Sequence, residues 1–244
     1  LLRGRVNVHT VVDDLVSGFV ELQESVGAQG APSTDTLHQG YLALSGLADV
    51  IDVQVGRMEL QYGNQRMVSP LDWSNFARAW DGARVQFHSG EFAVDLFGTQ
   101  PVAGQGGVTG NEDFYGLYAQ WNGEPVQVDL YAFKRRDLRL LIDDYTYGGL
   151  VEGSVEMFRF DLEGAIQTGD RAVVLDAQAF ALAARVFADL EVIELGAAFE
   201  WASGDSNPLD GDSETFIPLF NFAHAYQGYA DIVVWQNLQD VILM

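Results

Sequence analysis

The chain has 244 residues, which is long enough for one large all-β domain. It contains no cysteine, and this excludes disulfides, thiol nucleophiles and thiolate metal sites. A formal net charge of −22 argues strongly against binding of nucleic acid, or of an anionic membrane surface, by the exterior as a whole.

The 13 basic residues are unevenly divided, because all of them except Lys134 are arginines. Arginine suits positions where a fixed cation must hold a carboxylate or phosphate through two hydrogen bonds. The bias therefore indicates cations at positions that require this kind of contact, although a GC-rich gene explains the ratio equally well.

Alternation of polar and apolar side chains predicts strands along most of the chain. Trp80 and Arg84 share one parity, whereas Val85 and Phe87 share the other, so this strand has one polar and one apolar face. Similar patterns predict strands at residues 1–12, 15–24, 37–44, 50–62, 76–88, 91–99, 113–121, 126–136, 155–164, 176–187 and 192–202, with a last strand near 230–235.

Three stretches depart from simple alternation. The apolar phase slips near Gly56, which predicts a β-bulge there. Residues 137–153 are the least regular part of the chain. The alanine-rich residues 176–187 have some helical character, but their neighbours favour a strand. Longer polar or glycine-rich loops are expected at 27–36, 63–75, 101–110 and 203–214.

About a dozen strands of roughly ten residues match the length of tilted membrane strands better than the shorter strands of soluble sandwiches. No segment resembles a transmembrane helix or a signal peptide, but a closed barrel needs no such helix. The prediction is a single all-β domain over residues 1–244, an antiparallel transmembrane β-barrel. Its lipid-facing side chains are expected to include Val85, Phe87, Phe158 and Leu182. Aromatic residues near strand ends could form interfacial girdles, namely Tyr41, Trp73, Trp80, Trp121, Tyr131, Trp201, Tyr229 and Trp235.

Three ordered blocks of sequence resemble the alginate export family of outer-membrane β-barrels. The first runs from GRMELQYGNQR through LDWSN to WDGAR, within residues 56–84. The second is DFYGLY at 113–118. The third begins with WASGD at residue 201 and continues through HAY and GY to WQNL, which ends at residue 238.

The resemblance implies a barrel of about eighteen strands in a Gram-negative outer membrane, with an arginine-lined lumen that passes an anionic uronate polysaccharide. The sequence departs from this pattern because fewer strands are predicted and the end, Ile242-Leu243-Met244, lacks the usual terminal aromatic residue. We therefore expect the chain to be partial.

The candidate solute pathway consists of arginines on polar strand faces or beside them, together with Trp80, a residue that could stack on a sugar ring. Two interpretations are open for the arginines. They could form a guanidinium ring that attracts a carboxylate polymer or small anion, or they could pair with wall acids such as Asp81, Asp95, Asp161 and Glu163. The pathway set is Arg3, Arg5, Arg57, Arg66, Arg78, Trp80, Arg84, Arg159 and Arg185.

A loop rich in oxygen ligands contains Asp205, Asn207, Asp210 and Asp212. These side chains could hold Ca²⁺, but the spacing lacks the EF-hand pattern, so a solvated acidic loop is the simpler interpretation. No other cofactor is indicated. Motifs of hydrolases, zinc proteases and phosphate-binding loops are missing from the sequence, and we expect no enzymatic activity.

The function predicted from the sequence is a passive outer-membrane channel for anionic or polar solutes, with an acidic polysaccharide such as alginate implied by the resemblance alone. The expected partners are outer-membrane lipid and the solute, without nucleic acid; the sequence identifies no envelope-protein partner. Two alternatives are a structural or docking barrel whose lumen is plugged by loops and a soluble all-β carbohydrate-binding protein.

Overall fold

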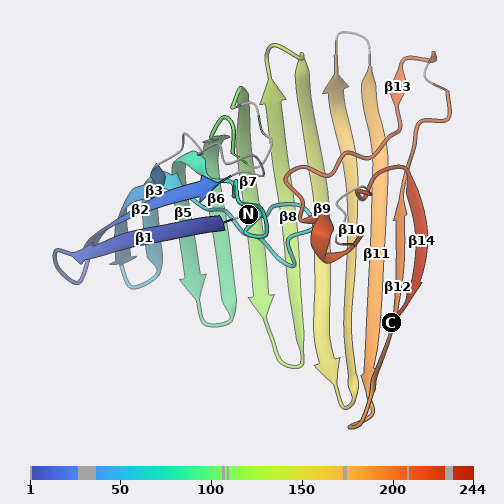
Figure 1. Ribbon diagram of the computed structural model, residues 1–244, viewed down its shortest axis with the longest axis horizontal. Helices are drawn as coiled ribbons and strands as arrows, with labels where there is room; N and C mark the ends of the chain where they lie inside the picture. Colours follow the sequence, from blue (N-terminus) through green and yellow to red (C-terminus); the bar gives the residue numbers. More distant parts are fainter. Residues whose placement is uncertain are drawn as a thin grey trace.

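The computed structural model describes residues 2–26, 37–105, 108, 110–172, 175–207, 209–228 and 233–244. The fold is one antiparallel meander in which each long strand pairs with the next in the sequence (Figure 1). The long strands are β1 (Leu2–Val11), β2 (Val16–Val26), β3 (Leu37–Leu47), β4 (Ile51–Met58), β5 (Trp80–Ser89), β6 (Phe92–Pro101), β7 (Glu112–Asn122), β8 (Val126–Asp137), β9 (Ile142–Val155), β10 (Phe158–Arg171), β11 (Asp176–Asp189), β12 (Glu194–Ala202) and β14 (Leu238–Leu243).

Two short elements complete the described structure. Strand β13 (Asp212–Ser213) pairs in parallel with β11, and the 3-10 helix η1 (Ala223–Ala225) lies in the long connection between β12 and β14. Within the described residues the sheet runs from β1 at one edge to β14 at the other without closing. No helix of this described part is long and apolar enough to cross a membrane.

The sheet has two chemically different faces, as the alternation predicts. Along β10, Asp161, Glu163 and Gln167 are buried on the inner face, whereas Leu162 and Ile166 are 46% and 54% exposed on the outer face. Phe87, Phe158 and Leu182, which we expected to face lipid, are likewise exposed by 36–47%. Val85 is partly exposed. The predicted all-β antiparallel fold with an apolar outer face is confirmed.

Two long segments leave the sheet and lie across its concave side. They are residues 59–79, between β4 and β5, and residues 203–237, between β12 and β14 (Figure 1). We call them the first and second inward segments. Both lie at the end of the sheet opposite the tight turns such as the one at Gly90. The sheet therefore has one end with short turns and one end with long connections, a division that is typical of outer-membrane barrels.

The phase slip at Gly56 has a different cause from the predicted bulge, which is wrong. Gly56 pairs in register with both Tyr41 and Gly82, so the ladder is continuous there. The apolar side chains change face instead. Met58 and Leu60 point inward and are fully buried, because the inward segments cover this part of the inner face.

Three other local predictions need correction. The stretch expected to be irregular contains β9, a strand of 14 residues, and β10 continues past Gly164 to Arg171. Of the strand predicted near 230–235, residues 230–232 lie outside the described residues, and residues 233–235 are not in a strand; the last described strand is β14, and the indole of Trp235 is buried against Phe216.

Only part of the proposed aromatic girdle faces outward. Trp121 and Trp201 are 38% and 44% exposed on the outer face, near opposite ends of the sheet. Trp80, Tyr131 and Trp235 are buried on the inner side. The others are Tyr41, which is partly buried, and Trp73, which lies in the first inward segment; Tyr229 lies outside the described residues.

Replacing Leu162 by arginine tests the lipid-facing role of the outer face. We expect the free energy of unfolding in lipid bilayers to fall by about 2–4 kcal/mol, because the new charge must enter hydrocarbon. Leu209→Arg is the matched control, since Leu209 is 92% exposed in the second inward segment, and it should change stability by less than about 0.5 kcal/mol. Denaturant titration of vesicle-embedded protein measures both, and equal values would contradict the assignment of the faces.

Candidate functional site

The inner face of the sheet, together with the two inward segments, is the candidate functional site. Five of the predicted arginines lie on inner-face positions of strands: Arg3 and Arg5 on β1, Arg84 on β5, Arg159 on β10 and Arg185 on β11. Arg66 and Arg78 lie in the first inward segment.

Arg66 is the centre of a buried ionic cluster. Its side chain is 1% exposed, and its Nη1 donates a short hydrogen bond to the Glu200 carboxylate of β12. The carboxylates of Glu163 and Asp161 lie 3.7 and 3.8 Å from its Nε and Nη2. The guanidinium also lies 3.8 Å from the centre of the Tyr226 ring. A buried guanidinium needs several partners of this kind to offset its loss of water.

Arg66 thereby joins the first inward segment to the wall and to the second segment. Backbone hydrogen bonds reinforce the contact: Ser69 N donates to Phe220 O at 2.9 Å, and Phe220 N donates to Met67 O at 2.8 Å. Arg78 Nη1 donates to the backbone oxygen of Asn221 at 3.1 Å. Burial lowers the pKa of Arg78 to about 10, so its guanidinium stays charged at neutral pH.

An apolar cluster lies beneath the two segments, on the inner face of the sheet. Aromatic rings from β6, β7 and β8 meet side chains of both segments, and Gly116 leaves the space for them. A Cβ atom at position 116 would lie 2.2 Å from the Phe97 ring. The cluster includes Met58, Leu60, Tyr62, Met67, Val68, Trp80, Phe97, Phe114, Phe133, Phe216, Phe220 and Trp235.

Trp80, which we predicted to line the solute pathway, belongs to this cluster. It is fully buried, and its ring meets Phe220 edge-on with centroids 5.5 Å apart. The predicted sugar-stacking surface is therefore covered. The polar parity was assigned correctly, but the inward segments convert this part of the inner face into a core.

Arg57 is also placed differently from the prediction. It shares the outward parity of Val53 and Val55, and its guanidinium makes two hydrogen bonds, of 2.8 and 3.0 Å, to the carboxylate of Asp81 on the neighbouring strand. Because the sheet continues through Gly56 without a bulge, the side chain at position 57 points away from the lumen.

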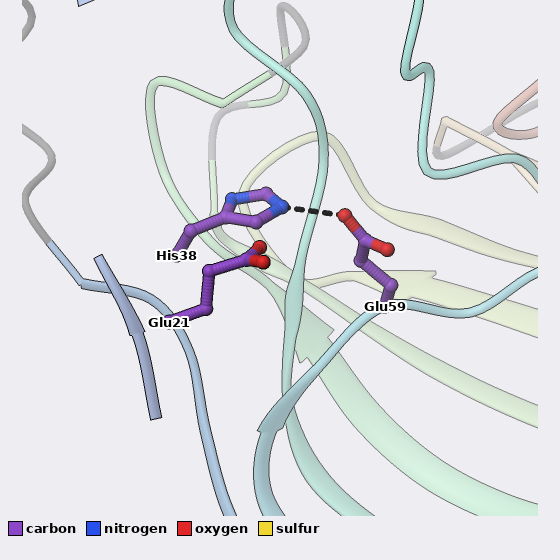
Figure 2. A group of neighbouring side chains, drawn as sticks. All are labelled: Glu21, His38 and Glu59. Atoms are coloured by element: carbon purple, nitrogen blue, oxygen red, sulfur yellow. Dashed lines mark hydrogen bonds and ion pairs between the residues drawn. The ribbon is translucent and has the colours of Figure 1, made fainter. Parts of the chain in front are cut away.

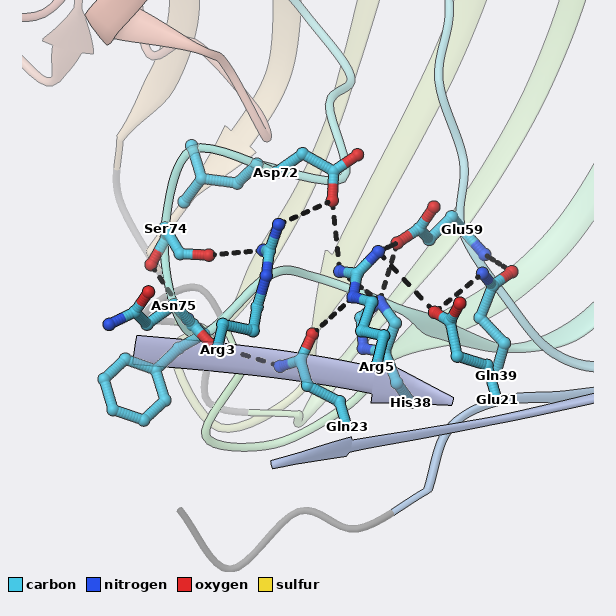
Figure 3. Close-up of polar contacts among 12 residues, drawn as sticks. Arg3, Arg5, Glu21, Gln23, His38, Gln39, Glu59, Asp72, Ser74 and Asn75 are labelled. Carbon is cyan, nitrogen blue, oxygen red and sulfur yellow. Dashed lines mark hydrogen bonds and ion pairs between the residues drawn. The ribbon is translucent and has the colours of Figure 1, made fainter. Parts of the chain in front are cut away.

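A second ionic cluster docks the tip of the first inward segment on β1 and β2 (Figure 3). Arg5 Nη2 lies 3.0 Å from Asp72 Oδ1, and Arg3 Nη1 donates to the backbone oxygen of Ser74 at 2.8 Å. Ser25 on β2 donates its hydroxyl to the backbone oxygen of Asn75 at 2.5 Å. The first inward segment is thus held at two places, at Arg66 and at residues 72–75.

The other inner-face arginines also have carboxylate neighbours. Arg84 Nε lies 3.7 Å from Asp95, Arg185 Nε donates to Asp161 at 2.8 Å, and Arg159 Nη2 lies 3.3 Å from Glu194. These are ion pairs of the kind that the second interpretation of the arginines predicted. All three side chains remain 23–59% exposed.

The sequence analysis missed a third ionic cluster that is centred on Asp144 of β9. Arg135 Nη2 donates to Asp144 Oδ2 at 2.7 Å, and Arg171 Nε donates to the same oxygen at 3.2 Å. Arg171 also bonds Gln167 and the backbone oxygen of Thr215 in the second inward segment. Extending the parity of Asp161 and Glu163 for eight more residues would have found Arg171.

The structure does not bring the acidic-loop residues together as a calcium site. Asp205 accepts a hydrogen bond from the backbone of Asn207, and Asp210 accepts one from the backbone of Asp212. The one convergent group of potential metal ligands among the described residues lies elsewhere, at Glu21, His38 and Glu59. Calcium binding by the loop stays a prediction.

Solved structures with a similar fold are outer-membrane β-barrels. OccK11 (OpdR) of Pseudomonas aeruginosa aligns with a TM-score of 0.56 and 12% identity, over 83% of this chain and 62% of that one. OccK9 (OpdG) of the same organism aligns with a TM-score of 0.53 and 14% identity, over 83% of this chain and 61% of that one. The chain thus has the fold of an outer-membrane porin and spans less than two thirds of these relatives' length.

The family is shown by a separate comparison. The model of the alginate export family matches residues 18–244, and the chain therefore belongs to that family. A comparison with curated proteins finds no match. Family and fold together place the chain in the outer membrane of a Gram-negative bacterium. The alternative of a soluble carbohydrate-binding protein is thereby wrong.

Replacing Arg66 by methionine tests its role as the anchor of the inward segments. We expect a loss of about 3–5 kcal/mol in the docking of the segments, because the buried carboxylates of Glu163 and Glu200 lose their cation, whereas Asp161 keeps Arg185. Limited proteolysis of the folded protein should then cleave within residues 59–79, while the sheet survives. Arg57→Met, which breaks an exposed pair worth about 0–1 kcal/mol, is the control. Equal protease resistance of wild type and Arg66→Met would contradict the role.

Proposed function

We propose that the chain forms the wall of a passive outer-membrane channel for polar and anionic solutes. The observation that carries the proposal is the division of the sheet: an apolar exterior surrounds an inner face on which guanidinium and carboxylate groups alternate across neighbouring strands. A face of this kind is stable in a membrane only if it is turned away from lipid, toward other polar groups or water.

The pathway would use the arginines that keep exposed surface, on the side of the inward segments nearer the tight turns. Arg159 and Arg185 line a cavity of about 700 Å³ that also contains Glu152, Asp161 and Phe187. Arg84 lies in a separate, smaller cavity with Asp52 and Gln86. Both cavities contain both signs of charge.

Paired charges of this kind suit weak, reversible binding. A carboxylate of the solute can replace Asp95 beside Arg84 or Glu194 beside Arg159, and each exchange conserves the number of ion pairs. Binding therefore stays weak enough for release, as conduction requires. The carboxylate-bearing polymer suggested by the family name, alginate, has the right chemistry to make successive exchanges.

A second candidate function is a docking barrel with a closed lumen. It is favoured by the apolar cluster under the inward segments, in which Met58, Trp80, Phe220 and other large side chains are fully buried. A polymer could not pass through this part of the interior without displacing both segments.

Conductance separates the two functions. Reconstituted in planar bilayers, the native full-length protein should show single-channel currents if it is a channel. Replacing residues 69–76 by a glycine–serine linker should then raise the conductance, because the first inward segment narrows the pathway. A native protein without current that conducts only after this replacement would support the docking barrel and contradict the channel.

Neutralising the exposed arginines tests the anion preference. In the double variant Arg84→Gln with Arg185→Gln, we expect the anion-to-cation permeability ratio to fall about two- to fivefold, which corresponds to roughly 1 kcal/mol of Coulomb energy. Reversal potentials in a salt gradient give this ratio. Arg57→Gln removes one positive charge from the outer face and should leave the permeability ratio unchanged. Equal reversal potentials for the double variant and wild type would rule out a role of these arginines in selectivity.

A further inference from the structure

Three potential metal ligands converge on the inner face where β2, β3 and the start of the first inward segment meet. They are Glu21 of β2, His38 of β3 and Glu59, and one ligand atom from each lies within 4.8 Å of the other two (Figure 2). His38 is fully buried and Glu21 is 6% exposed. Glu21 pairs with Gln39, and the register between β2 and β3 shifts directly beyond this pair, so His38 is the extra residue of an irregularity beside Glu21.

The hydrogen bonding of His38 is not satisfied by any of its protonation states. Its Nε2 lies 2.6 Å from Glu59 Oε1, an acceptor when ionised, and 3.0 Å from Arg5 Nη2, which can only donate. A protonated Nε2 would satisfy the carboxylate and oppose the guanidinium, and a bare Nε2 would do the reverse. The ring is buried and cannot turn this nitrogen toward water, so one of its two contacts is always unfavourable.

A divalent cation removes this conflict. With a metal ion between the three residues, the Nε2 lone pair and both carboxylates point at positive charge, and none of them needs a proton. One imidazole nitrogen with two carboxylate oxygens is a ligand set for Zn²⁺ and similar transition metals, with a fourth position left for water. Calcium and magnesium prefer oxygen ligands alone.

Arg5 occupies the place of this cation. Its Nη1 lies 3.1 Å from Glu59 and 3.5 Å from Glu21, so it now balances the two carboxylates. Its side chain is long and 20% exposed, and it already contacts the exposed carboxylate of Asp72 (Figure 3). It can therefore move toward Asp72 without entering an apolar region.

Neighbouring amides hold the Glu21 carboxylate and the backbone of Glu59 in position. Gln39 Nε2 donates to Glu21 Oε1 at 3.4 Å, and the backbone nitrogen of Glu59 donates to Gln39 Oε1 at 3.2 Å. Asn7 Nδ2 reaches the second oxygen of Glu21, also at 3.4 Å. Metal ligands are commonly oriented by hydrogen bonds of this type.

We propose that Glu21, His38 and Glu59 form a binding site for a transition-metal dication of the Zn²⁺ type, with Arg5 as the cation that gives way to it. Metal binding transfers Arg5 to Asp72 and so strengthens the docking of the first inward segment at its tip. The site does not depend on which solute the channel carries.

Calorimetric titration of the detergent-purified full-length protein with Zn²⁺ tests the site. We expect one saturable site, whose affinity falls at least about tenfold in His38→Gln and in Glu59→Gln. His88→Gln is the matched control, because His88 also lies on the inner face but faces a single carboxylate, Asp52, at 3.6 Å. It should bind as wild type does.

In Arg5→Gln we expect the Zn²⁺ affinity to change in the opposite direction. This variant therefore distinguishes the loss of a ligand from misfolding. Removing the competing cation should raise the Zn²⁺ affinity several-fold, which damage to the fold would not do. Co²⁺ offers a second measurement, since its visible absorption reports a nitrogen and oxygen ligand set and should vanish in His38→Gln. Equal Zn²⁺ binding by wild type, His38→Gln and His88→Gln, or no binding by wild type, would overturn the proposal.

Discussion

In a membrane-spanning sheet, every backbone polar group within hydrocarbon must bond to a neighbouring strand, and the rest of this structure depends on that requirement. It makes the meander from β1 to β14 continuous, with unbroken registers such as that between β10 and β11. Once the strands are paired, each side chain has only two directions available. The apolar set, including Leu162 and Ile166, is committed to one face, and the acids and arginines to the other.

The charged side chains on the inner face then need partners of opposite charge, because many of them are buried away from water. It does so in three ionic clusters, around Arg66, Arg5 and Asp144, and each contacts an inward segment. The charges therefore do two things at once. They neutralise each other, and they fix the segments that decide how much of the interior remains open. Breaking a pair leaves a buried charge behind, so the clusters resist rearrangement more strongly than surface pairs do.

The two inward segments also explain why polar and apolar regions share one interior. Where they cover the wall, aromatic rings such as Trp80 and Phe133 pack as they do in a soluble core. Where they do not, Arg84, Arg159 and Arg185 keep exposed surface beside their carboxylate partners. The candidate pathway is therefore electrically mixed. The exchange of ionic partners that we propose for the transported solute depends on this mixture of charges.

The sequence by itself determined the strands, their alternation, the outward direction of residues such as Phe87 and Phe158, and the family. Local periodicity sufficed for this, because a strand places its side chains according to its own backbone. It failed where the partner came from far along the chain. Only the tertiary structure placed Trp80 under Phe220, turned Arg57 to Asp81 on the outer face, and brought Arg66 to Glu200, which lies 134 residues away. Those contacts depend on how the sheet curves and on where two long segments fold back across it, and neither leaves a periodic signal in the residues themselves.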